Sequence, residues 1–166
     1  RYIGDWSSDV CSSDLRIIPY ENQIDYNAIK KYKDMILYCK KNNIEPIVTL
    51  HHFTRPMWFD FKYEGLHSEF FLEKFNQYIL LVIEHLCPYL NYLITFNEPF
   101  LECLNGYIRG TRPPGYSMDF SNMYLALKNI LDAHSFTYYE VKKKYPNILI
   151  SFSKNLVKFK KKYKYD

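Results

Sequence analysis

The sequence predicts an α/β protein in which parallel strands alternate with helices. Amphipathic helical patterns and short apolar runs follow one another in the order helix, strand, helix, strand, helix, strand. Such alternation is typical of parallel strands joined by crossover helices. The strands are apolar on both faces, as expected for a sheet that is covered on both sides. A doubly wound sheet and a (β/α)8 barrel both fit, but no G-x-G-x-x-G nucleotide loop follows any strand.

The first helix is predicted over residues 25–41, where apolar positions recur at three- and four-residue steps and lysines occupy the opposite face. The pair Asn42-Asn43 is a plausible stop. After Pro46, the β-branched run "IVTLHHF" predicts a buried strand over residues 47–50.

Two further helix–strand units follow. The second helix is expected to begin near Ser68, a good N-cap residue, and to end at Pro88, before a strand over 92–96. The third helix is predicted over about 121–145, before a strand over 148–152. We expect its buried face to carry Tyr124, Leu127, Leu131, His134, Tyr138 and Val141, with His134 as a core histidine that has a partner.

Composition excludes several classes of protein. Hydrophobic residues make up 48% of the 166-residue chain, which is enough for a packed core. The net charge of +4 resides in the lysine-rich tail, residues 158–166, so the remainder is neutral and predicts neither a nucleic-acid nor a membrane partner. The longest apolar run, residues 78–83, is too short to span a bilayer, and no signal peptide is expected.

The four cysteines contain no C-x-x-C pair and are widely spaced, so the sequence predicts neither a zinc site nor a disulfide scaffold. We expect no metal and no cofactor. A reducing cytoplasm is the simplest setting, and we expect a bacterial source. The oligomeric state stays open.

Residues 1–15 differ from everything that follows. They contain no lysine and no asparagine, and "SSDV" is nearly repeated as "SSDL". We interpret this segment as non-native, since it resembles translated sequencing adapter; the alternative is a genuine polar loop. Residues 16–157 are then the native domain.

Polar side chains follow each predicted strand at the end where parallel sheets bind ligands. The three pairs are His51 and His52, Asn97 and Glu98, and Ser153 and Asn155. Each pair alone could be structural or turn chemistry, but three together predict a site for a polyhydroxylated ligand such as a sugar. The aromatic residues Phe53, Trp58 and Phe59 could contact the sugar's C–H faces.

Glu98 is the candidate for acid chemistry. A carboxyl group that loses hydration can stay protonated near neutral pH and donate a proton to a leaving oxygen. Successive strand residues point to opposite faces, so Asn97 and Glu98 reach one pocket only if the chain bends. We expect Pro99 to hold Glu98 extended and to stop the sheet.

Three segments resemble glycoside hydrolase family 1, the β-glucosidase type. They are "VTLHHFTRPMWF" at 48–59, "TFNEP" at 95–99 and "GYIRGTRPPG" at 106–115. "RIIP" at 16–19 resembles the end of that family's second strand, and "DAHSFTYYEV" at 132–141 its long helix. The resemblance implies a fragment of a (β/α)8 TIM barrel, from about strands 2/3 to 5, and a retaining β-glycosidase.

The resemblance also implies roles for individual residues. Glu98 would be the acid/base, Asn97 would bind the 2-hydroxyl and His52 the glycone hydroxyls. Arg16 would steady the nucleophile. Trp58 and Asn155 would belong to the aglycone side or to a loop.

The sequence departs from the family pattern in what it lacks. Asp14-Leu15 stands where a Trp-Ser pair is usual, and "YEGLH" where Gly-Gly-Trp is usual. The first strand and the strand that carries the nucleophile are absent, and such a barrel needs about 250 residues. Two alternatives remain: an inert carbohydrate-binding half-barrel, and a Lys/Tyr-rich tail that binds nucleic acid or anionic surfaces.

Overall fold

The computed structural model describes residues 16–156. The segment interpreted as non-native, residues 1–15, and the lysine-rich tail, residues 158–166, lie outside the described residues.

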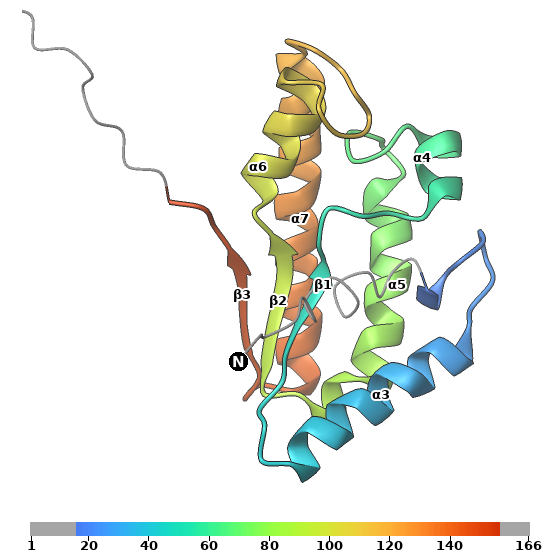
Figure 1. Ribbon diagram of the computed structural model, residues 1–166, viewed down its shortest axis with the longest axis vertical. Helices are drawn as coiled ribbons and strands as arrows, with labels where there is room; N and C mark the ends of the chain where they lie inside the picture. Colours follow the sequence, from blue (N-terminus) through green and yellow to red (C-terminus); the bar gives the residue numbers. More distant parts are fainter. Residues whose placement is uncertain (1–15, 157–166) are drawn as a thin grey trace, which may run out of the picture.

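The centre of the structure is a parallel sheet of three strands (Figure 1). The strands are β1 (Ile47–His51), β2 (Tyr92–Asn97) and β3 (Leu149–Ser153), in the order β1-β2-β3. Ile47 pairs with Tyr92, and Tyr92 pairs with Leu149, so the three carboxyl ends meet at one edge. The predicted parallel sheet is therefore confirmed.

The three long helices lie on one side of this sheet (Figure 1). Helix α3 (Tyr26–Lys41) is capped by the Asp25 carboxylate, which accepts hydrogen bonds from the backbone of residues 27 and 28. Helices α5 (Phe71–His85) and α7 (Phe120–Lys144) pack against each other, and the Asp119 carboxylate caps α7. Each cap satisfies backbone N–H groups that have no partner within the helix.

The predicted ends of the second helix need correction. Ser68 does not cap α5; its hydroxyl accepts a hydrogen bond from the backbone of Phe70, which is itself the N-cap residue. Pro88 lies in a separate 3-10 helix, Cys87–Tyr89. A local side-chain bond in the preceding turn competes with capping, which a sequence pattern does not reveal.

The buried face of α7 also differs from the prediction. Tyr124, Leu131 and Tyr138 are exposed, and the buried positions are Ala126, Ile130, Ala133, Thr137 and Val141. Small residues bring the helix axis close to the sheet, so backbone proximity outweighs side-chain hydrophobicity here. His134 is confirmed as partly buried with a partner, since its Nδ1 lies 2.8 Å from the Thr95 hydroxyl.

The two faces of the sheet have different surroundings. Val48, Leu50 and Leu93 are buried beneath the helices. On the opposite face the paired residues Ile47, Tyr92 and Leu149 are 59%, 39% and 60% exposed. The core therefore lies between the sheet and its helices.

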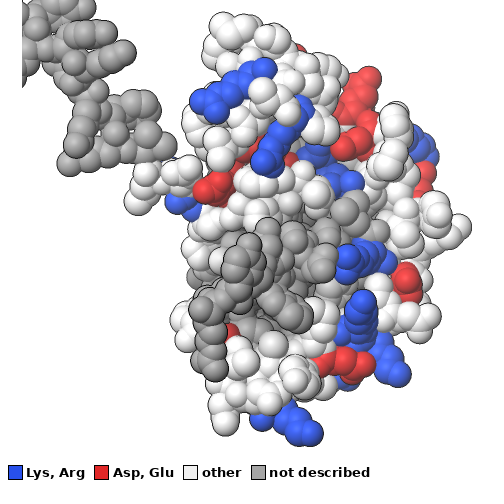
Figure 2. Space-filling model, viewed as in Figure 1, with Lys and Arg blue, Asp and Glu red and all other residues white. Residues whose placement is uncertain are grey.

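Two short helices surround the carboxyl ends of the strands. Helix α4 (Met57–Tyr63) follows β1, and α6 (Pro99–Cys103) follows β2 and continues into a π-helical turn, Leu104–Ile108. On the face shown in Figure 2, basic and acidic side chains are interspersed. No helix among residues 16–156 is long and apolar enough to cross a membrane.

Candidate active site

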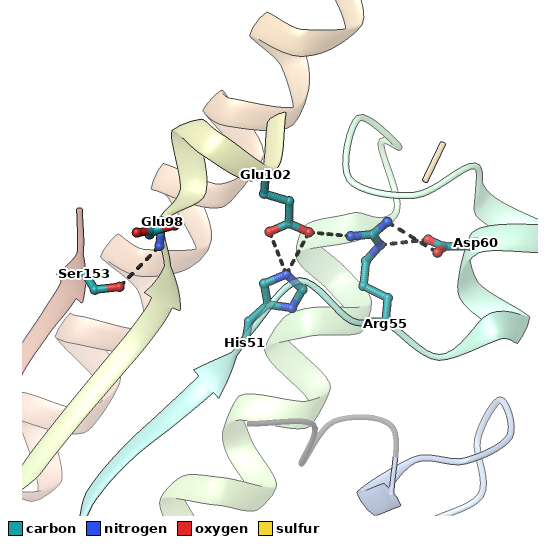
Figure 3. Close-up of polar contacts among 6 residues, drawn as sticks. All are labelled: His51, Arg55, Asp60, Glu98, Glu102 and Ser153. Atoms are coloured by element: carbon teal, nitrogen blue, oxygen red, sulfur yellow. Dashed lines mark hydrogen bonds and ion pairs between the residues drawn. The ribbon is translucent and has the colours of Figure 1, made fainter. Parts of the chain in front are cut away.

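The ends of β2 and β3 are joined by hydrogen bonds around Ser153. The backbone N–H of Glu98 donates to the Ser153 carbonyl at 3.0 Å and to its hydroxyl oxygen at 3.3 Å. The Ser153 hydroxyl in turn donates to Oδ1 of Asn97 at 2.7 Å. Figure 3 shows Glu98 at the tip of β2 beside Ser153. Two strand ends therefore position the backbone of the candidate acid.

The chain turns sharply at Glu98. Its φ of 46° and ψ of 56° are left-handed, so the extended conformation expected before Pro99 is wrong. Pro99 instead occupies the first position of α6, where its missing N–H costs nothing. The pairing register of β2 and β3 also shifts between Ile94 and Asn97. This bend is the one that Asn97 and Glu98 need to approach a common site.

The Glu98 side chain is half-buried, and it makes no capping hydrogen bond to α6. Among the residues drawn in Figure 3, its carboxyl group has no partner. A carboxyl group in this position can give or take a proton.

His52 lies within electrostatic reach of Glu98 at this edge, and Phe53 and Arg112 group around His52. The ring centroids of His52 and Phe53 are 4.9 Å apart, and the Arg112 guanidinium lies 4.4 Å from the Phe53 centroid. Burial and the neighbouring His51 lower the pKa of His52, against an opposing influence of Glu98. A neutral imidazole can both donate and accept a hydrogen bond, as binding a sugar hydroxyl requires.

The other predicted site residues, Trp58, Arg16 and Asn155, make different contacts from those of this cluster. Trp58 is partly buried, and its indole N–H donates to the Ile18 carbonyl at 3.0 Å. It therefore fastens the segment that begins at Arg16, which is exposed. Asn155 is exposed beyond the end of β3.

A buried ionic network lies beside the site, and sequence reasoning missed it. His51 Nε2 lies 2.9 and 3.1 Å from the two carboxylate oxygens of Glu102. Arg55 donates to Glu102 at 2.6 Å and to Asp60 at 2.7 Å (Figure 3). The side chains of His51, Glu102 and Arg55 are only 1%, 3% and 5% exposed. The four-residue step from Glu98 to Glu102 was the available signal, because it is one helical turn.

The contacts within the network determine the charge states of Glu102 and Arg55. Burial alone would raise the pKa of Glu102, but His51 and Arg55 outweigh it and hold that pKa below the ordinary value. Burial would likewise lower the pKa of Arg55, but Glu102 and Asp60 raise it. Glu102 is thus an anion that only accepts, so His51 carries its hydrogen on Nε2.

No group of three or more His, Cys, Asp or Glu side chains within residues 16–156 could hold a metal ion. The described cysteines Cys39, Cys87 and Cys103 are free thiols. Glu98, His52 and Asn97 bring a carboxyl group, an imidazole and an amide to this edge.

Comparison with known proteins shows the family to which the chain is related. The family model of glycosyl hydrolase family 1 matches residues 11–162. A 6-phospho-beta-galactosidase from Clostridium acetobutylicum is 34% identical over 121 residues, which are 72% of this chain and 25% of the relative. The chain thus spans about a quarter of that relative's length.

Solved structures give the same result. The beta-glycosidase from Pyrococcus horikoshii superposes with a TM-score of 0.76 and 32% identity, over 84% of this chain and 32% of that one. A beta-glucosidase from Exiguobacterium marinum gives 0.80 and 25% identity, over 89% and 33%.

The sheet and helices are therefore part of a TIM barrel of the β-glycosidase type, as predicted. The chain belongs to glycosyl hydrolase family 1.

Proposed function

We propose that this chain supplies the acid/base half of a retaining β-glycosidase site. The observation that carries the proposal is Glu98 itself: a half-buried carboxyl group at the carboxyl end of β2, anchored through its backbone to β3 and adjoining His52. In a TIM barrel, catalytic side chains come from this end of the strands. The substrate class is a β-linked glycoside.

Glu98 would protonate the leaving oxygen as the glycosidic bond breaks, while a carboxylate elsewhere in the barrel attacks the sugar. Glu98, now ionised, would then remove a proton from the water that releases the sugar. Asn97 would bind the 2-hydroxyl and His52 the glycone hydroxyls. Arg16 would steady the nucleophile, and Trp58 and Asn155 would border the aglycone side.

The Glu98 role can be tested in a chimera that joins residues 16–156 to the remaining strands of the P. horikoshii β-glycosidase. Glu98→Gln should reduce the rate on the order of 10²–10⁴ for glycosides with poor leaving groups. Aryl glycosides with very good leaving groups need little protonation, so their first step should lose far less. Equal losses for both substrates would exclude Glu98 as the general acid.

We further propose that the chain alone does not hydrolyse glycosides. Retention needs a second carboxylate about 5–5.5 Å from the acid. Glu102 is the carboxylate one turn away, but His51 and Arg55 occupy it. Glu64 is 76% exposed, and Asp119 caps α7, so neither offers a positioned second carboxylate for an inverting route.

The check is an assay of residues 16–166 with an activated aryl β-glucoside against buffer. No turnover is expected. Turnover that disappears in Glu98→Ala would contradict the proposal, whereas saturable sugar binding without turnover in the chimera as well would favour the inert carbohydrate-binding alternative.

A further inference from the structure

The buried network consists of His51, Arg55, Glu102 and Asp60. It lies next to the two candidate site residues, His52 and Glu98. His51 ends β1 and precedes His52 in the chain. Glu102 lies in α6, one turn after Glu98, and its backbone N–H donates to the Glu98 carbonyl at 3.1 Å. Glu102 thus contacts the end of β1 through its carboxylate, and it contacts Glu98, which follows β2, through its backbone N–H.

Helix α6 depends on such contacts for its position. It has five residues and continues into the π-helical turn, which ends at Ile108; neither part has a side-chain cap, and α6 begins from a residue in left-handed conformation. A helix this short has little stability of its own, so tertiary contacts fix its direction. Its buried side chains are Pro99, Glu102 and Cys103, and Glu102 makes the directional bonds.

Stability alone is a poor reason for this arrangement. Buried ion pairs lose hydration, and well-packed apolar side chains often replace them without loss of stability. What apolar side chains do not supply is direction. Arg55 holds Glu102 from one side and His51 from another, with donor–acceptor distances of 2.6 and 2.9 Å.

We propose that Glu102 is a positioning residue, which uses its bonds to His51 and Arg55 to set the distance between the Glu98 carboxyl group and the His52 imidazole. The consequence for catalysis rests on the proposed function of Glu98. The effect of Glu102 on the distance between Glu98 and His52 does not depend on that function. It can be measured in residues 1–166.

The measurement is a double-mutant cycle on residues 1–166, read by NMR titration of the His52 ring. The charged groups that act on His52 are His51, Glu98, Arg112 and Glu102. Glu98→Gln should lower the pKa of His52, because it removes a carboxylate that favours the imidazolium. The same substitution is then made in a Glu102→Asp background.

Glu102→Asp keeps the charge but shortens the side chain, so it must release a partner or move α6. We expect the effect of Glu98→Gln on the His52 pKa to be clearly smaller in that background, which is the non-additivity of coupled sites. Glu73→Asp is the matched control, since Glu73 is 57% exposed on α5. The titration of His134, which bonds Thr95 on the helix side of the sheet, should not change in any variant.

Equal effects of Glu98→Gln in both backgrounds, with the fold retained, would overturn the proposal and leave Glu102 a structural residue. If Glu102→Asp does not fold, Arg55→Lys provides the same comparison, because it keeps the charge and loses the guanidinium geometry. Unfolding of both variants would also overturn it, since the network would then maintain the fold rather than orient the site. An inactive chimera would refute the proposed function and leave this cycle unaffected.

Discussion

Glu98 and Glu102 are four residues apart at the ends of one short helix, yet their surroundings differ in every respect. Glu98 is half-buried, and its firm contacts are made by its backbone. Glu102 is 3% exposed and its carboxylate binds both His51 and Arg55. The same side chain is therefore partly open to solvent in one place and fixed as an anion in the other, because Glu102 alone of the two is buried against cationic partners.

The largest difference should appear in stability. Glu102→Ala leaves the buried guanidinium of Arg55 with Asp60 alone, and removing one partner of a buried pair typically costs about 3–5 kcal/mol. Glu98→Gln removes no such partner and should change the free energy of unfolding by less than about 0.5 kcal/mol. Urea unfolding of residues 1–166 measures both. Comparable losses would show that the two carboxylates are not distinguished by their surroundings.

A smaller effect isolates the bond between Arg55 and Glu102. Arg55→Met, Glu102→Gln and the double variant should give a coupling energy of about 0.5–3 kcal/mol. The matched pair is Lys128 and Asp132 on α7, whose side chains are 54% and 44% exposed. Lys128→Met and Asp132→Asn should couple far more weakly, because water screens the pair. Equal coupling in the two cycles would mean that burial adds nothing.

The smallest effect is expected from acid. The pKa of Glu102 is lower in the folded protein than the ordinary 4.5, so above about that pH its contribution to stability is complete. As pH falls below it, the unfolded chain binds the proton first and the contribution is lost. The protonated group still accepts hydrogen bonds, so the loss stays below that of Glu102→Ala.

Urea unfolding of the wild type and of Glu102→Gln, from pH 7 to about pH 3, tests this sign. The difference between the two proteins should shrink as the solution becomes more acidic. A difference that grows with acid would mean that the pKa is raised, and that burial prevails over Arg55 and His51.

The sequence by itself determined the elements and their order. Alternating periods of hydrophobicity predicted the three long helices and three strands, because burial of one face of a helix and short apolar runs in strands leave that pattern in the sequence. It also placed Asn97 and Glu98 at a strand end, since parallel strands bring their carboxyl ends to one edge. The quoted motifs then indicated the family to which the chain belongs.

Only the tertiary structure decided which side chains meet. On α7, the small residues Ala126 and Ala133 face the protein core in place of Tyr124 and Tyr138. Close packing selects by shape as well as by hydrophobicity. The left-handed bend at Glu98 and the bond from His51 to Glu102, 51 residues apart, are likewise set by contacts between separate elements. The local sequence does not predict such contacts. A glutamate one turn after Glu98 gives the same sequence pattern whether its side chain contacts water or a buried arginine.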